Sequence, residues 1–436
     1  MRDELIGLLS KLVSMNTVND PARGLRPGRE AADFIRDWLE AAGLRAEVIE
    51  SSGYYSVLAS TGGEPCVMFM AHYDVVPPGP GWVTDPFTLV IKDGRAYGRG
   101  VADDKGNVAA LMLAAREVAR SELGRGVLFA FTGDEEIGGR NGAYVIAESL
   151  RRRGEVPRYL INADGTGASP IIRRRKGFRA IIRVGREEVV VKGSVKREEF
   201  RALYPLSQHS HAAYFLPGVD THPVVWASAF VREKRVMAVS LSGDFIKGNV
   251  IPPKAVLEYV GEGDGEVVAD EGLTRLLRAI YPLVRAPIAT EAFSEYGVSI
   301  TPNMYSFDGK VHELALDIRA MSGKRAVEEV LRSVVDAMLP GAGLEVRTGP
   351  GEYLNTPPIA RLVNEALKAL REEGFSPEPV EGAGASDSRY FTDIVAEAID
   401  MGPIGGNVHG PNEWVDIASL ERLSRVFAKL ARRLTR

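Results

Sequence analysis

The stretch PCVMFMAHYD, residues 65–74, places an unbroken apolar run directly before a histidine and an aspartate. A run of this length without polar alternation is typical of a strand that is buried on both faces of a parallel sheet. Two similar runs follow, GVLFAFT at 126–132 and RYLINAD at 158–164. Helical patterns occupy the intervening segments 104–120 and 141–152. Strands that alternate with helices at these lengths predict βαβ units and a parallel sheet.

The pattern of predicted helices and strands changes after about residue 172. Strand-like segments such as GFRAIIRVG and KVHELALDIRA are separated by turns, and long apolar runs become fewer. Long helical patterns return near residue 351. We therefore predict an α/β fold with a mixed, mainly parallel sheet and helices on both faces, interrupted by a smaller α+β lid domain. The predicted α/β domain spans 1–175 and 351–436, and the predicted lid domain spans 176–350.

The composition is that of an ordinary globular protein. The 436 residues are 45% hydrophobic and 26% charged, and the formal net charge is −4. This charge offers no basic footprint for nucleic acid, and the single cysteine, Cys66, excludes an intrachain disulfide and a cysteine-rich zinc module. The amphipathic N-terminus lacks the pattern of a signal peptide, and no apolar run is long enough to cross a bilayer. We therefore expect a cytoplasmic protein with neither nucleic acid nor membrane as a partner.

Acidic and histidine side chains follow the predicted strands. In an open parallel sheet, ligands bind beyond the carboxyl ends of the strands, so these side chains should meet at one edge. Two histidines and several carboxylates suit zinc, with cobalt or manganese as substitutes, and carboxylates can bridge two such ions. Each motif alone has an ordinary explanation as a helix cap or a solvated surface group, but together they predict a two-metal hydrolytic site. The side chains concerned are His72, Asp74, Asp103, Asp104, Asp134, Glu135, Glu136, Asp164 and His409.

The order of these motifs resembles the M20 metallopeptidase family, which includes dipeptidases, aminoacylases and succinyl-diaminopimelate desuccinylases. The resemblance spans nearly the whole chain and is carried by HYDVVP, GRGVADDKG, TGDEEIGG, NADG and HGPNE. It implies two divalent metal ions, with zinc expected first and cobalt or manganese as alternatives. By position, His72 and Asp164 would bind one metal, Glu136 and His409 would bind the other, and Asp103 would bridge both.

The resemblance also implies roles for groups that hold no metal. Asp74 would orient His72, because a metal-binding histidine usually has its other ring nitrogen held by a carboxylate. A cis peptide bond would follow Asp103. Glu135 would be the general base that takes a proton from the metal-bridging water and delivers it to the leaving amine. Adjacent carboxylates at a strand end point apart, so Glu135 can face this water while Glu136 binds metal.

Four further residues are candidates for substrate binding. The segment QHSHAAYFLPG contains His209 and His211, and the resemblance favours His211 as a lid histidine that reaches a neighbouring active site in dimeric members; an exposed loop histidine is the alternative. Asn249 would contact substrate, or it only forms a turn. Arg319 would pair with a substrate carboxylate through its bidentate fork, or it belongs to an ordinary interdomain ion pair. Gly384 would let the backbone approach the substrate closely; the alternative is that Ser386 and Asp387 of this turn are helix caps.

The motifs leave more than one function open. The first is hydrolysis of a dipeptide or short peptide, because Asp164 and a long insert between Asn249 and Arg319 resemble the aminopeptidase and dipeptidase branch. The second is hydrolysis of an N-acyl amino acid, as by succinyl-diaminopimelate desuccinylase or an acetylornithine-type deacetylase. A metal-binding protein without catalysis is the third, against which the presence of Glu135 argues. A homodimer through the lid domain is also expected, unless the enlarged lid replaces the partner.

Overall fold

The structure is a computed structural model that divides into two compact units. Unit 1 consists of Met1–Arg174 and Leu354–Arg436, and unit 2 is the inserted segment Arg175–Tyr353. Each unit has its own hydrophobic core. The described residues are 1–203, 211–215, 221–290 and 295–436.

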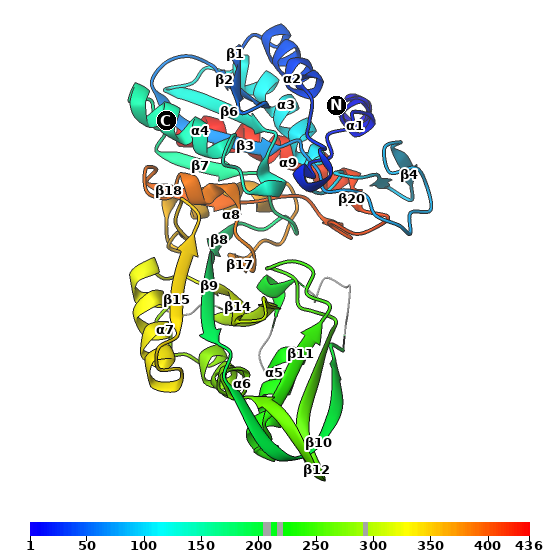
Figure 1. The fold of residues 1–436 in the computed structure, drawn as a ribbon. Helices are drawn as coiled ribbons and strands as arrows, with labels where there is room; N and C mark the ends of the chain where they lie inside the picture. Colours follow the sequence, from blue (N-terminus) through cyan, green and yellow to red (C-terminus); the bar gives the residue numbers. More distant parts are fainter. Residues whose placement is uncertain (204–210, 216–220, 291–294) are drawn as a thin grey trace. The chain divides into compact units, whose positions relative to one another are not determined.

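Unit 1 is built on a nine-stranded mixed sheet (Figure 1). In spatial order its strands are β1 (Arg45–Ser51), β2 (Tyr54–Ser60), β6 (Gly126–Thr132), β3 (Pro65–His72), β7 (Tyr159–Asn162), β18 (Glu397–Asp400), β8 (Ile171–Arg174) and β16 (Leu354–Asn355), with β17 (Val380–Gly382) beside β8. The central strands β6, β3, β7 and β18 are parallel to one another. The predicted α/β class with a mixed sheet is therefore confirmed.

Helices cover both faces of this sheet (Figure 1). One face carries α3 (Lys105–Ala119) and α9 (Ile417–Leu434), which pack against each other. The opposite face carries α4 (Ala143–Arg153). The helices that complete the first layer are α1 (Arg2–Ser14), α2 (Arg29–Ala41) and α8 (Arg361–Glu372).

Strand β3 lies between these two layers. Phe69 enters the core formed with α3 and α9, where its ring lies 5.8 Å from the ring of Phe427. Its neighbours Met68 and Met70 enter the core formed with α4. Both faces of β3 are buried, which is the physical reason why the strand is an unbroken apolar run in the sequence.

A small antiparallel sheet in unit 1 joins two loops that lie far apart in the sequence. It consists of β19 (Gly405–Gly406), β20 (Trp414–Asp416), β5 (Arg95–Tyr97) and β4 (Val90–Lys92), in that order. Tyr97 of β5 pairs with Trp414 of β20. The segments that follow β5 and precede β20, which carry Asp103 and His409, therefore start from neighbouring backbone positions.

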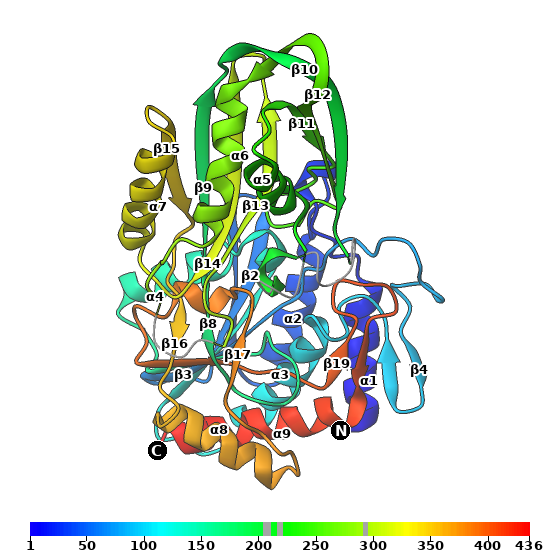
Figure 2. The same cartoon turned by 90° about the horizontal axis from the view of Figure 1, so that it is seen from below.

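The described residues of unit 2 form two antiparallel sheets and three α-helices around one core (Figure 2). The first sheet has the order β13 (Ser299–Phe307), β14 (Val311–Ala320), β9 (Lys176–Gly185) and β15 (Gly343–Thr348). The second has the order β10 (Glu188–Arg201), β12 (Lys254–Asp270) and β11 (Ala238–Gly243). The helices are α5 (Pro223–Lys234), α6 (Glu271–Val284) and α7 (Lys324–Met338). Across the described residues of the whole chain, no helix combines the length and the apolar character that crossing a bilayer requires.

A buried histidine lies at the N-terminal end of α5. His222 is 2% exposed, and its Nε2 lies 3.1 Å from Oδ1 of Asn303. The amide nitrogen of Asn303 donates to the carbonyl of Gly248 at 2.8 Å, which leaves Oδ1 as the acceptor for the imidazole N–H. Burial disfavours the charged imidazolium and lowers the pKa of His222 from 6.5 to about 4.

This histidine is expected to make unit 2 sensitive to acid. Because the folded-state pKa is lowered, the unfolded chain binds the extra proton first, so stability is lost as the pH falls from about 6.5 towards about 4. Replacing His222 by glutamine keeps the donor to Asn303 and removes the titration. The difference in unfolding free energy between wild type and H222Q should shift by about 2 kcal/mol between about pH 7.5 and about pH 5 in urea titrations. An unchanged difference would contradict this assignment.

Candidate active site

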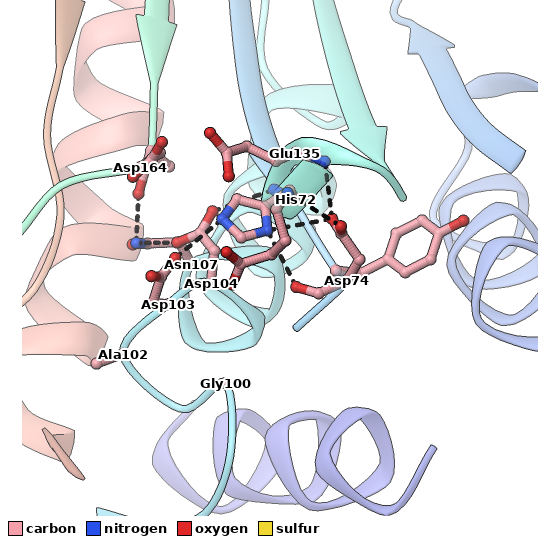
Figure 3. Close-up of polar contacts among 12 residues, drawn as sticks. His72, Asp74, Gly100, Ala102, Asp103, Asp104, Asn107, Glu135 and Asp164 are labelled. Carbon is pink, nitrogen blue, oxygen red and sulfur yellow. Dashed lines mark hydrogen bonds and ion pairs between the residues drawn. The ribbon is translucent and has the colours of Figure 1, made fainter. Parts of the chain in front are cut away.

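His72 is the last residue of β3, and Asp74 follows it in the loop beyond the sheet (Figure 3). Nδ1 of His72 lies 3.1 Å from the carbonyl oxygen of Asp74 and 3.4 Å from its Oδ1. A carbonyl oxygen can only accept, so Nδ1 carries a proton and Nε2 is the ring nitrogen that faces the other ligands. Nε2 lies 2.9 Å from Oδ1 of Asp103. The imidazole is therefore held by Nδ1 and oriented with Nε2 toward Asp103, as in metal-binding histidines whose second nitrogen is hydrogen-bonded.

Five predicted metal ligands come together in two overlapping sets. His72, Asp103 and Asp164 form the first set, and Asp103, Glu136 and His409 form the second; within each set the three ligand atoms lie within 4.8 Å of one another. Nε2 of His409 lies 3.0 Å from Oδ2 of Asp103 and 3.1 Å from Oε2 of Glu136. Asp103 thus presents one oxygen to each histidine, which is the geometry of a bridging carboxylate.

The loop between β5 and α3 carries Asp103. The peptide bond between Asp103 and Asp104 is cis, as the family resemblance implied. Asp104 is fully buried, and its Oδ2 accepts a hydrogen bond from the backbone N–H of His72 at 3.1 Å. Its Oδ1 accepts from Nδ2 of Asn107 at 2.6 Å. Asp104 therefore ties the Asp103 loop to the end of β3 (Figure 3).

Asp74 is also fully buried and organises the turn that carries the two glutamates. Its Oδ1 accepts from the backbone N–H of Glu135 and its Oδ2 from that of Glu136, each at 3.1 Å. Oδ2 also accepts from Nδ2 of Asn19 at 2.8 Å. One carboxylate thus orients His72 and fixes the short 3₁₀ helix Glu135–Ile137. Asn19 was not a candidate from the sequence, because a single asparagine near the N-terminus carries no motif.

The charges of the two sets depend on one another. Burial alone would lower the pKa of His72, but the hydrogen bonds with Asp103 and Asp74 raise it well above 6.5. The carboxylate of Glu136 and then that of Asp103 raise the pKa of His409 in the same way. Burial alone would raise the pKa of Asp103, but His409 and His72 lower it. The surroundings of each imidazole therefore favour its positively charged form.

The carboxylates with no such partner show the opposite shift. Burial, together with the Asp164 and Asp387 carboxylates, raises the pKa of Glu135 well above 4.5. Burial raises the pKa of Asp164 to about 6, although Arg174 opposes this. Oε1 of Glu136 is buried without a hydrogen-bond partner. Uncompensated negative charge and an unpaired carboxylate oxygen fit bound divalent cations, and the oxygen and imidazole donors suit zinc, cobalt or manganese.

Asp164 is held in place by Arg174, which sequence reasoning missed. Nη2 of Arg174 donates to the carbonyl of Asp164 at 2.7 Å, and Nε pairs with Asp400. Nη1 donates to the carbonyl of Gly384 at 3.3 Å. Arg174 thereby links the predicted substrate residue Gly384 to Asp164 of the first ligand set. A Cβ atom added at Gly384 would meet no atom within 4 Å. The space beside Gly384 is therefore open.

The other predicted substrate residues lie in unit 2. His211 and Asn249 contact each other, with 3.1 Å between Nε2 and Nδ2, while Nδ1 of His211 accepts from the N–H of Ala213. Arg319 forms a bidentate pair with Asp317, at 2.8 and 2.9 Å, on the wall of a depression of about 400 Å³. Arg319 is thus part of an ion pair, but its partner lies on the same strand, β14, so this is not the interdomain pair that was the predicted alternative. His209 lies outside the described residues.

A family model and named relatives match most of this chain in sequence. The model of the family described as Peptidase family M20/M25/M40 matches residues 68–433. Succinyl-diaminopimelate desuccinylase from Bordetella petrii is 28% identical over 90% of this chain and 89% of its own, and that from Xylella fastidiosa is 28% identical over 99% and 98%.

Two solved structures share the fold at low sequence identity. Aminoacylhistidine dipeptidase from Vibrio alginolyticus has a TM-score of 0.70 at 14% identity and covers 98% of this chain and 96% of its own. Aminopeptidase PepT from Bacillus cereus has a TM-score of 0.64 at 14% identity and covers 100% and 99%. Since the family model spans most of the sequence, from β3 to α9, the chain belongs to peptidase family M20/M25/M40.

Proposed function

We propose that this M20 hydrolase uses two divalent cations to cleave the amide bond of a dipeptide or short peptide, with Glu135 as general base. The observation that carries the proposal is the position of Glu135. Its backbone is fixed by Asp74, its neighbour Glu136 belongs to the second ligand set, and neither set found among the described residues includes Glu135 itself. An acid that binds no metal beside two ligand sets is available for proton transfer.

The proposed reaction moves one proton through Glu135. The cations, with zinc expected first and cobalt or manganese as alternatives, would supply Lewis acidity toward the scissile carbonyl and the attacking water. Glu135 takes a proton from the water while the oxygen of that water attacks the carbonyl carbon. As the carbon–nitrogen bond breaks, Glu135 gives this proton to the amine, leaving a carboxylic acid and an amine as products. Asp74 keeps Glu135 and His72 oriented while this happens.

The preference for a peptide rests on two features of the chain. Asp164 occupies a position where the resemblance assigns aspartate to the aminopeptidase and dipeptidase branch. The long insert between Asn249 and Arg319 includes β12, α6 and β13, which would enlarge a lid. We propose that His211 and Asn249 bind the substrate as a pair, that Arg319 binds its carboxylate in competition with Asp317, and that the backbone at Gly384 lies against it.

An N-acyl amino acid is the second candidate substrate. The curated relatives are named succinyl-diaminopimelate desuccinylase and match this chain over 90% and 99% of its length. An acetylornithine-type deacetylase would use the same donor sets. Both alternatives need the same metal centre, so only the pocket around the substrate distinguishes them.

A substrate panel separates the two classes. With cobalt or zinc added, we expect kcat/KM for unblocked dipeptides to exceed that for N-succinyl and N-acetyl amino acids by roughly tenfold or more, measured by release of the free amine. The variant E135Q, assayed in parallel, controls for contaminating peptidases. The reverse order would assign the N-acyl substrate, and failure to cleave either class by metal-loaded protein would reject the proposed function.

The proposed partners are small substrates and a second copy of the chain. Strand β10 pairs only with β12 among the described residues, so its other edge presents unpaired backbone groups to which a second chain can add. A homodimer through unit 2 therefore stays a prediction, as does the cytoplasmic location. Neither nucleic acid nor a membrane is an expected partner.

A further inference from the structure

A buried ion pair between Arg99 and Glu413 contacts the backbone of two residues of the ligand sets, Asp103 and His409. Arg99 is 1% exposed and Glu413 is fully buried. Oε2 of Glu413 accepts from Nη1 of Arg99 at 2.6 Å and from the N–H of Gly100 at 2.9 Å. Oε1 accepts from the N–H groups of Ala102 and Asp103 at 2.8 and 3.0 Å. One carboxylate therefore binds three backbone N–H groups of the segment that ends at Asp103.

The other end of Arg99 reaches the loop that carries His409. Nη2 of Arg99 donates to the carbonyl oxygens of His409 and Gly410 at 3.3 and 3.2 Å. The same nitrogen lies 3.5 and 3.4 Å from the carbonyls of Pro77 and Pro78, in the loop beyond β3. A single guanidinium thus joins its own loop, which carries Asp103, to the loop that carries His409 and to the loop that follows His72.

The contacts are distributed unevenly between the two ligand sets. Asp103 and His409, two of the three donors of the second set, have backbones that the pair holds directly. In the first set, the pair holds only Asp103 in this way. His72 is anchored instead by Asp74 and Asp104. The carbonyl of Asp164 is held by Arg174. Loss of the pair should therefore affect the second set more than the first.

We infer that Arg99 and Glu413 are positioning residues that set the distance between Asp103 and His409 and thereby the cation affinity of the second set. This inference rests on the proposed metal centre. Glutamine at position 413 keeps the size of the side chain, but its amide nitrogen cannot accept, so two of the four donors lose their acceptor. Lysine at position 99 keeps the positive charge beside Glu413 and loses the planar fork that reaches the carbonyl of His409.

Binding of Co²⁺ alone, followed by titration calorimetry and by the visible absorption of the bound ion, tests this inference without an activity assay. For wild type we expect two ions. In E413Q and in R99K, the affinity for one ion should fall by about 10- to 100-fold, while the affinity for the other stays within about threefold. D270N is the matched control, since Asp270 is a buried carboxylate of unit 2 that accepts from the N–H of Leu273 and pairs with His312.

The outcomes separate the inference from the proposed function. A wild-type protein that binds no Co²⁺ would reject the metal centre and with it the proposed function. If wild type binds two ions and the variants lose both affinities equally, or lose neither, the positioning role is wrong and the pair only stabilises the fold. Failure of both E413Q and R99K to fold, judged by circular dichroism, would also overturn it. A selective loss that D270N does not reproduce supports it.

Discussion

Replacement of Glu135 by glutamine is expected to lower kcat by about 10³-fold while both ligand sets keep their cations. Glutamine has the size of glutamate but cannot take a proton from the attacking water. The backbone N–H at this position donates to Asp74 in either case, so the turn and its neighbour Glu136 should keep their positions. Turnover and bound metal are measured on the same preparation, by initial rates and by elemental analysis.

The control for this variant is a glutamate of unit 1 that has a different partner. Glu148, on α4, pairs with Arg151 at 2.7 Å and contributes to neither set among the described residues. E148Q should therefore retain wild-type turnover. If E135Q also retained it with a full complement of metal, Glu135 would not be the base. If it lost both metal and activity, its role would be structural.

Replacement of Asp103 by asparagine is expected to have the second large effect, because this residue alone belongs to both ligand sets. Its two oxygens face Nε2 of His72 and Nε2 of His409. An amide presents only one acceptor and no negative charge, so cation affinity should fall at both sets. We expect activity to fall by about 10³-fold or more, without recovery on addition of zinc, cobalt or manganese.

Two comparisons make the expectation for Asp103 specific. D164N removes a donor from the first set only, so it should weaken one ion while the second is still bound. D393N replaces an exposed aspartate that pairs with Arg151, and it should leave the binding of both ions unchanged. Wild type treated with a chelator should lose activity and regain it with any of the three metals. If D103N bound two ions with wild-type affinity, Asp103 would not be the shared ligand.

Much of the site was accessible from residue types and strand ends. Unbroken apolar runs such as residues 65–71 can be buried only between two layers, and the structure places β3 between α4 and the α3–α9 layer. Because parallel strands end at one edge, the side chains that follow β3, β6 and β7 were expected to meet there. His72, Glu136 and Asp164 follow from this reasoning, while His409 was recognised from its motif.

Other features of the site could not be predicted from the sequence. The sequence around Arg319 is compatible with a substrate carboxylate or an interdomain ion pair, and only the structure places Asp317 of the same strand at 2.8 Å from its Nε. Asn19 binds Asp74 although 55 residues separate them. Glu413 was part of a recognised motif, yet its contacts with Arg99, 314 residues away, and with the N–H groups of Ala102 and Asp103 could not be read from it.

The sequence by itself determined the buried central strands, the kinds of ligand at their ends and the family. The tertiary structure decided which carboxylate orients which imidazole, and which buried charges hold the ligand loops together. The reason is physical: hydrophobic periodicity is local, because each residue's burial depends on its position in one element. A hydrogen bond depends on the distance and angle between two groups, and these are set only when remote segments such as β5 and β20 pair.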